Sequence, residues 1–320
     1  MGEARGLTSR QRRLGRPEEP TNPITLDGIL LVDKPAGITS HDAVEHIRRA
    51  AQMRRVGHTG TLDPAATGLL ILCLGKGARL SEFLTSLDKV YEGAMRLGIT
   101  TDSYDLNGQI VEERQLPDLD ESAIQRVFDQ FTGEILQVPP MVSAVRVGGE
   151  RLYEKARKGE VVERVPRRVT VSEFSLRSYD PADVYFVLRC SRGTYARALC
   201  HDVGQALGCG AALVTLRRTW VGHHSLDRAT PLAQFQSREG VIKRLVPIEE
   251  ALDLPSVAVR GAAHRTVASG GVISREHLVG DCPVRHGWVQ IKAQSGELLA
   301  VGQVLPGRLI QPKRVFCSSP

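Results

Sequence analysis

The chain has 320 residues, 42% of them hydrophobic, and a formal net charge of +6. This length and composition predict a globular protein with one large and one small domain, and the basic balance favours a polyanionic partner. No apolar run reaches the length of a transmembrane helix and no secretory leader is evident, which excludes a membrane-spanning class; we expect a cytoplasmic protein.

The cysteines point to structural rather than chemical roles. None of the six belongs to a C-x-x-C pair. Most have apolar neighbours, so we expect buried, reduced thiols. Cys200, His201 and Cys209 fit no standard zinc spacing, and we expect no metal site.

The N-terminal residues 1–25 are rich in arginine and proline and poor in apolar side chains, which predicts a disordered basic extension. Added affinity for RNA is the alternative use of such an arm. Order is expected to begin with a buried strand at 28–35. A helix should follow, capped by Ser40, with Ala43, Val44 and Ile47 on its apolar face.

Residues 57–68 (GHTGTLDPAATG) are the most informative segment, a glycine-punctuated loop around one carboxylate. Pro64 pushes the backbone of Asp63 toward an extended conformation, and an apolar run of strand length follows at 69–74. A carboxylate held on a stiff loop beside a core strand suits a nucleophile. The alternative is an ordinary Asp-Pro turn.

Mixed elements follow the loop. The pattern predicts a short helix at 78–84, a strand at 89–98, a hairpin turn at Asn107-Gly108, an amphipathic helix at 121–131, a strand at 184–190 and a helix after Gly193-Thr194. Because helices and strands do not alternate strictly, an α+β fold is favoured over a doubly wound sheet.

The last part of the chain has a different character. A boundary is expected near 247–257, where two prolines flank an acidic segment. Strands are expected at 284–292 and 298–304, within a small β-rich domain. The predicted organisation is an extension at 1–25, a large domain at 26–250 and a small one at 255–316.

Several common enzyme signatures are absent from the sequence: the phosphate loop, G-x-G-x-x-G after a strand, H-E-x-x-H and G-x-S-x-G. Any chemistry must therefore come from side chains alone. The candidates are Asp63, Tyr91, Tyr195 and Arg197. Taken singly, Tyr91 fits better as an ordinary half-buried strand aromatic, and Arg197 fits better as a surface cation of a helix.

A set of motifs occurs in one order along the chain: GILLVDKPAGITS (28–40), GHTGTLDPAATGLL (57–70), DKVY (88–91), VPPM (138–141), GTYAR (193–197) and LRRT (216–219). This set resembles the TruB family of RNA pseudouridine synthases from about residue 28 onward. The resemblance implies a central mixed, mainly antiparallel sheet flanked by helices. It also implies a small, β-barrel-like PUA domain at 255–316.

The family isomerises the uridine at position 55, in the TΨC arm of tRNA, to pseudouridine. The C1′–N1 bond is cut, the uracil rotates, and it rejoins through C5. No group is oxidised or transferred, so the resemblance implies no cofactor and no metal. Flipping the base out of the arm is required for access to its C1′ and C5 atoms.

By resemblance, Asp63 is the catalytic carboxylate, and three routes stay open: attack at C1′, attack at C6, or assistance to a glycal-like intermediate. Arg197 corresponds to the arginine that pairs with this aspartate. Tyr91 corresponds to the aromatic that stacks on the flipped uracil and helps to remove the C5 proton.

The same resemblance assigns supporting roles to Tyr195, as a second active-site tyrosine, and to Lys34, beneath the catalytic floor. His58 would occupy the space left by flipped bases, and Leu216 would lie near the pocket. The implied partner is tRNA, bound through its T-arm and, by the PUA-like domain, near its acceptor end. We expect a monomer that needs no protein partner and no membrane.

Three departures from the family pattern are Ala65, Val90 and Val142. None replaces Asp63 or a residue that pairs with it. Two alternative functions remain: a tRNA-binding folding helper with secondary or lost isomerase activity, and a guide-RNA-dependent relative within a ribonucleoprotein.

Overall fold

The structure is a computed structural model that describes residues 26–141, 146–147, 150–151 and 162–317. The predicted N-terminal extension and Val142 lie outside the described residues. No helix within the described ranges is both long and apolar enough to cross a membrane.

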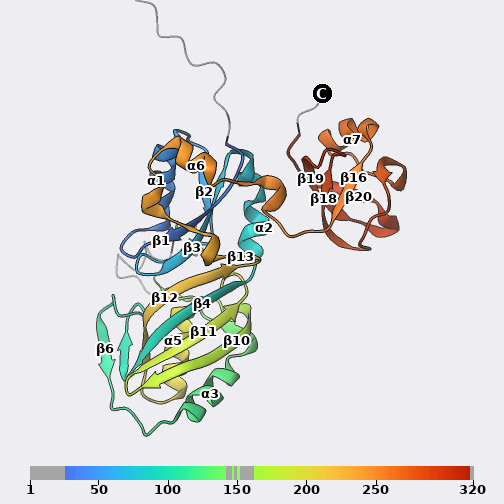
Figure 1. Cartoon of the computed structure of the whole chain (residues 1–320). Coiled ribbons are helices and arrows are strands. Elements are labelled where there is room, and N and C mark those ends of the chain that lie inside the picture. The colour runs from blue at the N-terminus through green and yellow to red at the C-terminus, as the bar shows by residue number, and fades with distance from the viewer. Residues whose placement is uncertain (1–25, 142–145, 148–149, 152–161, 318–320) are drawn as a thin grey trace, which may run out of the picture.

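A large mixed sheet forms the centre of the fold (Figure 1). Over the described residues it has eleven strands, with the main path β14-β1-β3-β12-β4-β11-β10-β7. These are β1 (Gly28–Lys34), β2 (Val56–Thr59), β3 (Thr67–Leu74), β4 (Lys89–Leu97), β7 (Gly133–Gln137), β10 (Arg167–Asp180), β11 (Asp183–Cys190), β12 (Ala211–Val221), β13 (His224–Ser225), β14 (Thr230–Pro231) and β15 (Val246–Pro247). Its strand pairs are antiparallel except β1 with β14 and β3 with β12. The predicted α+β class, with a mixed and mainly antiparallel sheet, is confirmed.

Along the path from β1 to β7, the shortest ladder is the parallel one between β3 and β12, which joins only two described residue pairs, Arg217 with Thr67 and Arg218 with Gly68. On one side, β1 and β3 lie with α1 (Ser40–Ala51) and α6 (Arg238–Lys243). On the other, β4, β10, β11 and β12 lie with α3 (Glu121–Gln130) and α5 (Ala196–Ala206) (Figure 1). The two halves have separate apolar cores.

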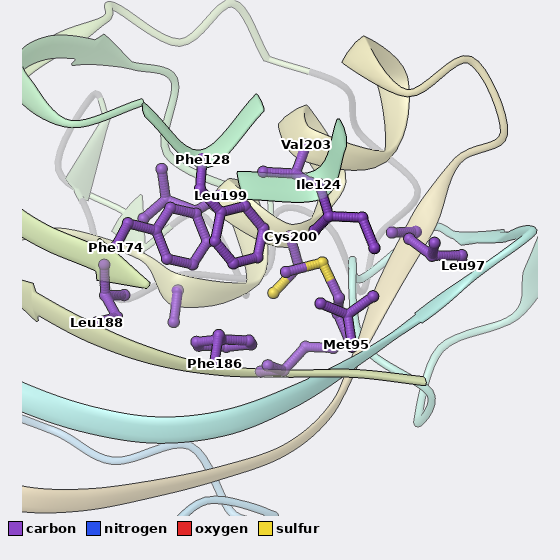
Figure 2. Packing of buried hydrophobic residues seen from close by; sticks show 14 of the residues in the cluster. Met95, Leu97, Ile124, Phe128, Phe174, Phe186, Leu188, Leu199, Cys200 and Val203 are labelled. Atoms are coloured by element: carbon purple, nitrogen blue, oxygen red, sulfur yellow. The ribbon is translucent and has the colours of Figure 1, made fainter. Parts of the chain in front are cut away.

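The core under α3 and α5 is built on aromatic packing (Figure 2). The rings of Phe128 and Phe174 stack with centroids 3.9 Å apart, and Phe186 meets Phe174 edge-on at 5.5 Å. Alternate residues of β11, including Phe186 and Leu188, face this core. Because side chains alternate between the two faces of a strand, every second residue of β11 can pack against the helices.

The N-cap of helix α1 lies one residue earlier than predicted. Thr39 is the N-cap and forms a capping box with Asp42. The prediction that Ser40 caps the helix is wrong, because its buried hydroxyl is engaged elsewhere. It accepts from the backbone N–H of Leu62 at 2.9 Å and donates to the Leu62 carbonyl at 3.1 Å.

Two other predictions shift at their boundaries. The short helix expected at 78–84 is a 3₁₀ turn (Gly75–Leu80) followed by α2 (Ser81–Ser86). The loop containing Asn107-Gly108 connects the paired strands β5 (Ile99–Thr101) and β6 (Ile110–Glu113). A further short antiparallel ladder pairs β8 (Arg146–Val147) with β9 (Glu150–Arg151).

A second sheet of five strands lies at the C-terminal side, counted over the described residues. Its strands are β16 (Ser256–Val259), β17 (Leu278–Val279), β18 (Gly287–Lys292), β19 (Leu298–Val304) and β20 (Ile310–Val315). The helix α7 (His264–Ala268) lies between β16 and β17 in the chain. The strand predicted at 284–292 begins only at Gly287, whose φ of +99° interrupts an extended backbone.

An apolar cluster joins the two sheets, and α2 lies between them (Figure 1). Leu298, Val301 and Phe316 from the C-terminal part join the cluster of Ile29 and Leu84 from the large part. The cysteines within the described residues are all free thiols, and all but the half-buried Cys317 are buried, as predicted.

Candidate active site

A cavity of about 370 Å³ opens where the two halves of the large sheet meet. The residues that line it come from the glycine-rich loop, α2, β4, β12 and the turn before α5; they include Gly60, Leu62, Asp63, Lys89, Tyr91, Arg192, Tyr195, Arg197, Leu213, Leu216 and Arg218. Segments far apart in sequence therefore converge on the loop that carries Asp63.

Buried polar contacts fix the loop from below. Lys34 at the end of β1 is fully buried, and its ammonium donates to the carbonyls of Pro35 and Ile38 at 2.8 Å and of Pro64 at 3.3 Å. The backbone N–H of Gly37 donates to the same Pro64 carbonyl at 2.9 Å. Burial lowers the pKa of Lys34 to about 8, although the nearby Asp63 charge opposes that shift.

Asp63 forms an ion pair with Arg197, with Oδ2 and Nη2 3.3 Å apart. The Arg197 side chain is 5% exposed and that of Asp63 is 47% exposed. Arg197 is also 3.7 Å from Oδ2 of Asp105 and donates to the Ser103 carbonyl at 3.4 Å. A buried guanidinium thus sits between two carboxylates and holds one of them at an accessible surface of the cavity.

The start of α5 presents Arg197 and Tyr195. The backbone of Tyr195, the N-cap, is held by Gln137 of β7. Its N–H donates to Oε1 of Gln137 at 2.8 Å, and Nε2 of Gln137 donates to its carbonyl at 3.1 Å. Gln137 is buried, so this reciprocal pair fixes where the helix begins.

Tyr91 and Leu216 occupy the junction between the two cores. Each is half-buried and packs against both apolar clusters. Burial raises the pKa of Tyr91, and the positive charge of Arg218 only partly opposes it. The phenol is therefore protonated at neutral pH.

Sequence reasoning assigned no role to Arg218, Lys89 or Gln137. Arg218 is almost fully buried on β12, where it donates to the carbonyl of Leu69 at 2.7 Å and of Gly60 at 3.0 Å. The Lys89 ammonium donates to the carbonyls of Thr85 and Leu87. Burial and the neighbouring Arg218 lower the pKa of Lys89 to about 8.

Gly68 explains why the loop can lie so close to β12. Its φ is +98°, and a Cβ there would lie 2.3 Å from the backbone oxygen of Arg218. Any side chain would force β3 and β12 apart at their two-residue ladder.

Of the predicted site residues, Asp63, Tyr91, Tyr195, Arg197 and Leu216 line one cavity. Lys34 lies beneath its loop, where it donates to the Pro64 carbonyl. His58 lies on β2 and is not among the lining residues; burial, and secondarily Arg218, lower its pKa, so the imidazole is neutral at pH 7.

Metal ligands do not gather in this part of the molecule. Within the described ranges, no group of three or more His, Cys, Asp or Glu side chains is placed to hold a metal ion.

Comparisons with known proteins match most of the chain. The family model described as TruB family pseudouridylate synthase (N terminal domain) matches residues 48–196. The tRNA pseudouridylate synthase B C-terminal domain matches residues 197–253.

Curated relatives are similar over nearly their full length. A tRNA pseudouridine synthase B of Opitutus terrae is 47% identical over 71% of this chain and 95% of its own. One of Cupriavidus metallidurans is 43% identical over 90% and 93%, and one of Coxiella burnetii is 37% identical over 91% and 95%.

Solved structures agree with the fold. A chain of an H/ACA RNP bound to a substrate RNA containing 2′-deoxyuridine superposes with a TM-score of 0.71, at 26% identity, over 93% of this chain and 88% of that one. A chain of an archaeal box H/ACA sRNP complex gives a TM-score of 0.70, at 26% identity, over 93% and 90%. With two matching family models and relatives at up to 47% identity, the chain belongs to the TruB family of pseudouridylate synthases.

Proposed function

We propose that this protein isomerises uridine to pseudouridine in tRNA, with Asp63 as the catalytic carboxylate. The observation that carries the proposal is the Asp63–Arg197 pair, at 3.3 Å, in a cavity that Tyr91 also lines. Relatives named tRNA pseudouridine synthase B, at 37–47% identity, support the reaction and the substrate class.

The chemistry needs an accessible carboxylate with a fixed direction. During isomerisation the C1′–N1 bond breaks, a C1′–C5 bond forms, the C5 proton leaves, and N1 gains a proton. Asp63 attacks C1′, attacks C6, or assists a glycal-like intermediate. In each route Arg197 orients the carboxylate, while Lys34 and Ser40 hold its loop in place.

The uracil must leave its stack to reach Asp63. On this proposal Tyr91 provides an aromatic face for the flipped base, and Leu216 closes the cavity from β12. Burial raises the pKa of the Tyr91 phenol, so it is protonated at neutral pH. On this proposal Tyr91 helps to remove the C5 proton only after its own proton has passed to another base.

The motif resemblance also indicates which uridine is the target. The target on this proposal is uridine 55 in the T-arm, with His58 in the space that the flipped bases leave. Residues 255–316 form the PUA-like domain, which would contact the acceptor end. The protein works as a monomer in the cytoplasm, without a guide RNA or protein partner.

The test is tritium release from transcribed tRNA that carries [5-³H]uridine. We expect release by the unchanged protein, none when the target uridine is replaced by cytidine, and loss of release in Asp63→Asn with tRNA binding retained. A fully active Asp63→Asn variant would overturn the assignment.

Two other results would redirect the proposal. Tight tRNA binding without release by the unchanged protein would favour the folding-helper alternative. Release that requires an added guide RNA would place the protein with the ribonucleoprotein enzymes.

A further inference from the structure

A second hollow, of about 640 Å³, lies between α2 and the C-terminal sheet. We call it the interdomain groove. Its lining comes from α2, from the turn before α5 and from strands β18 and β20; the residues are Glu82, Phe83, Ser86, Arg192, Trp288, Lys313 and Arg314.

The groove combines positive charge with an aromatic surface. Arg192, Lys313 and Arg314 face a single carboxylate, Glu82, which already pairs with Arg314 at 2.7 Å. Trp288 is 36% exposed, and its ring meets Phe83 edge-on with centroids 4.9 Å apart. Phe83 thus restrains the indole, part of which stays accessible.

The groove adjoins the active-site cavity. Arg192 lines both hollows, and the neighbouring residues Thr85 and Ser86 of α2 line one each. A polyanionic chain with one nucleotide in the cavity therefore has a positive charge beside it, at Arg192, where the two hollows meet. Cations that follow a backbone, together with an exposed aromatic, are how proteins hold single-stranded or splayed RNA.

We propose that the interdomain groove is a second RNA-binding subsite, in which Lys313 and Arg192 contact backbone phosphates and Trp288 stacks on an unpaired base. The inference rests on the proposed function for the identity of the RNA. It gives the C-terminal sheet a second contact, with the strand that flanks the target nucleotide, in addition to the acceptor-end contact proposed above.

The test uses the tryptophan itself. The chain has two tryptophans, so Trp220→Phe leaves Trp288 as the reporter, and Asp63→Asn in the same protein makes binding independent of turnover. We expect transcribed tRNA to quench Trp288 emission. Adding Lys313→Glu should weaken binding about tenfold and lower the slope of log affinity against log salt by about one or more.

Arg265→Glu is the matched control, because Arg265 is an exposed cation on α7 of the same domain and does not line the groove. We expect it to change affinity less than about twofold. Equal effects of the two charge reversals, or unchanged Trp288 emission at saturating tRNA, would overturn the groove.

The same two reversals in otherwise unchanged protein separate this inference from the proposed function. Lys313→Glu should raise KM for tritium release and leave kcat within about twofold. If tritium is released and Lys313→Glu leaves KM unchanged, the RNA-binding role of the groove is contradicted and the proposed reaction stands. If no tritium is released but Lys313→Glu still weakens tRNA binding more than Arg265→Glu does, the proposed reaction is contradicted and the groove stands.

Discussion

At the scale of single residues, the site depends on one guanidinium that serves two carboxylates. Arg197 reaches Asp63 and Asp105 and also the Ser103 carbonyl. A lysine carries the same charge at one point and cannot span those partners. We expect Arg197→Lys to lower kcat roughly 100-fold, the usual scale for losing a fixed electrostatic contact, and to change tRNA affinity little.

Single-turnover tritium release and tRNA binding together check this prediction. Arg217→Lys is the control, because Arg217 pairs with Asp33 at 2.8 Å and its side chain is 44% exposed. If the two substitutions slow release equally, the spanning geometry of Arg197 has no special role.

Lys89 gives a prediction for pH. Its folded-state pKa is about 8, lowered by burial and Arg218, against 10.5 for an ordinary lysine. Between these values the unfolded chain binds more protons than the folded one, so the Lys89 contribution to stability rises with pH across this window. Below pH 8 both states are protonated and the contribution is constant.

The measurement is urea unfolding of the unchanged protein and Lys89→Met at pH 7, 8, 9 and 10. We expect the difference in unfolding free energy to move in favour of the unchanged protein above pH 8. Lys243→Met, at an exposed lysine on α6, should give a flat difference; a flat difference for Lys89→Met would contradict its lowered pKa.

At the scale of elements, the start of α5 depends on a side chain nearly sixty residues away in sequence. Gln137 accepts from and donates to the backbone of Tyr195. Gln137→Leu keeps the size but leaves both backbone groups without this partner, which costs about 1–3 kcal/mol for a buried polar group. Since Tyr195 and Arg197 share this helix start, we also expect kcat to fall.

Unfolding free energy and kcat of Gln137→Leu provide the check, with Gln130→Leu as the control. Gln130 is exposed at the end of α3, so its replacement should change neither quantity. Equal losses in the two variants, or a stable and fully active Gln137→Leu, would show that the helix start does not need Gln137.

Local pattern predicted those elements whose residues follow one period. The helices at Glu121–Gln130 and Ala196–Ala206 and the strand at Lys89–Leu97 lie where apolar spacing placed them. Strand β12 was not predicted as an element, because its central Arg217-Arg218 breaks the apolar alternation. Arg218 is buried there because two carbonyls accept hydrogen bonds from its guanidinium, that of Gly60 in the glycine-rich loop and that of Leu69 on β3. Sequence spacing does not reveal these contacts.

The candidate site shows the same division. Motif resemblance located Asp63, Tyr91 and Arg197, and the fold brings them to one cavity. Gln137 and Asp105 act through contacts across the fold, and no local signal marked them. Ser40 looked like a helix cap because its residue type fits one, but the neighbouring Thr39 fits equally well and the fold uses Ser40 to hold Leu62.

At the scale of the whole molecule, the two sheets are joined through a shared core rather than by a bare linker. Leu298, Val301 and Phe316 pack into the cluster of the large sheet. The Arg314–Glu82 ion pair, at 2.7 Å, and the donation from Arg79 to the Val315 carbonyl add polar contacts beside it. This arrangement keeps the interdomain groove and the active-site cavity in a fixed relation.

A shared core predicts coupled unfolding. Phe316 is 2% exposed in that core, and Phe316→Ala should cost about 3–5 kcal/mol. If the sheets unfold together, the loss of unfolding free energy is the same whether it is measured on the large sheet or on the small one. Trp220 on β12 reports on the large sheet and Trp288 on β18 reports on the small one, so single-tryptophan proteins (Trp288→Phe and Trp220→Phe) follow each separately in urea.

We expect both reporters to shift to lower urea by the same amount in Phe316→Ala, because neither sheet can keep its side of the shared cluster dry once the aromatic ring is removed. Leu309→Ala, at a leucine that is 39% exposed just before β20, should shift neither transition. A shift of the Trp288 transition alone would mean that the small sheet unfolds by itself, and the groove would then open and close independently of the active-site cavity.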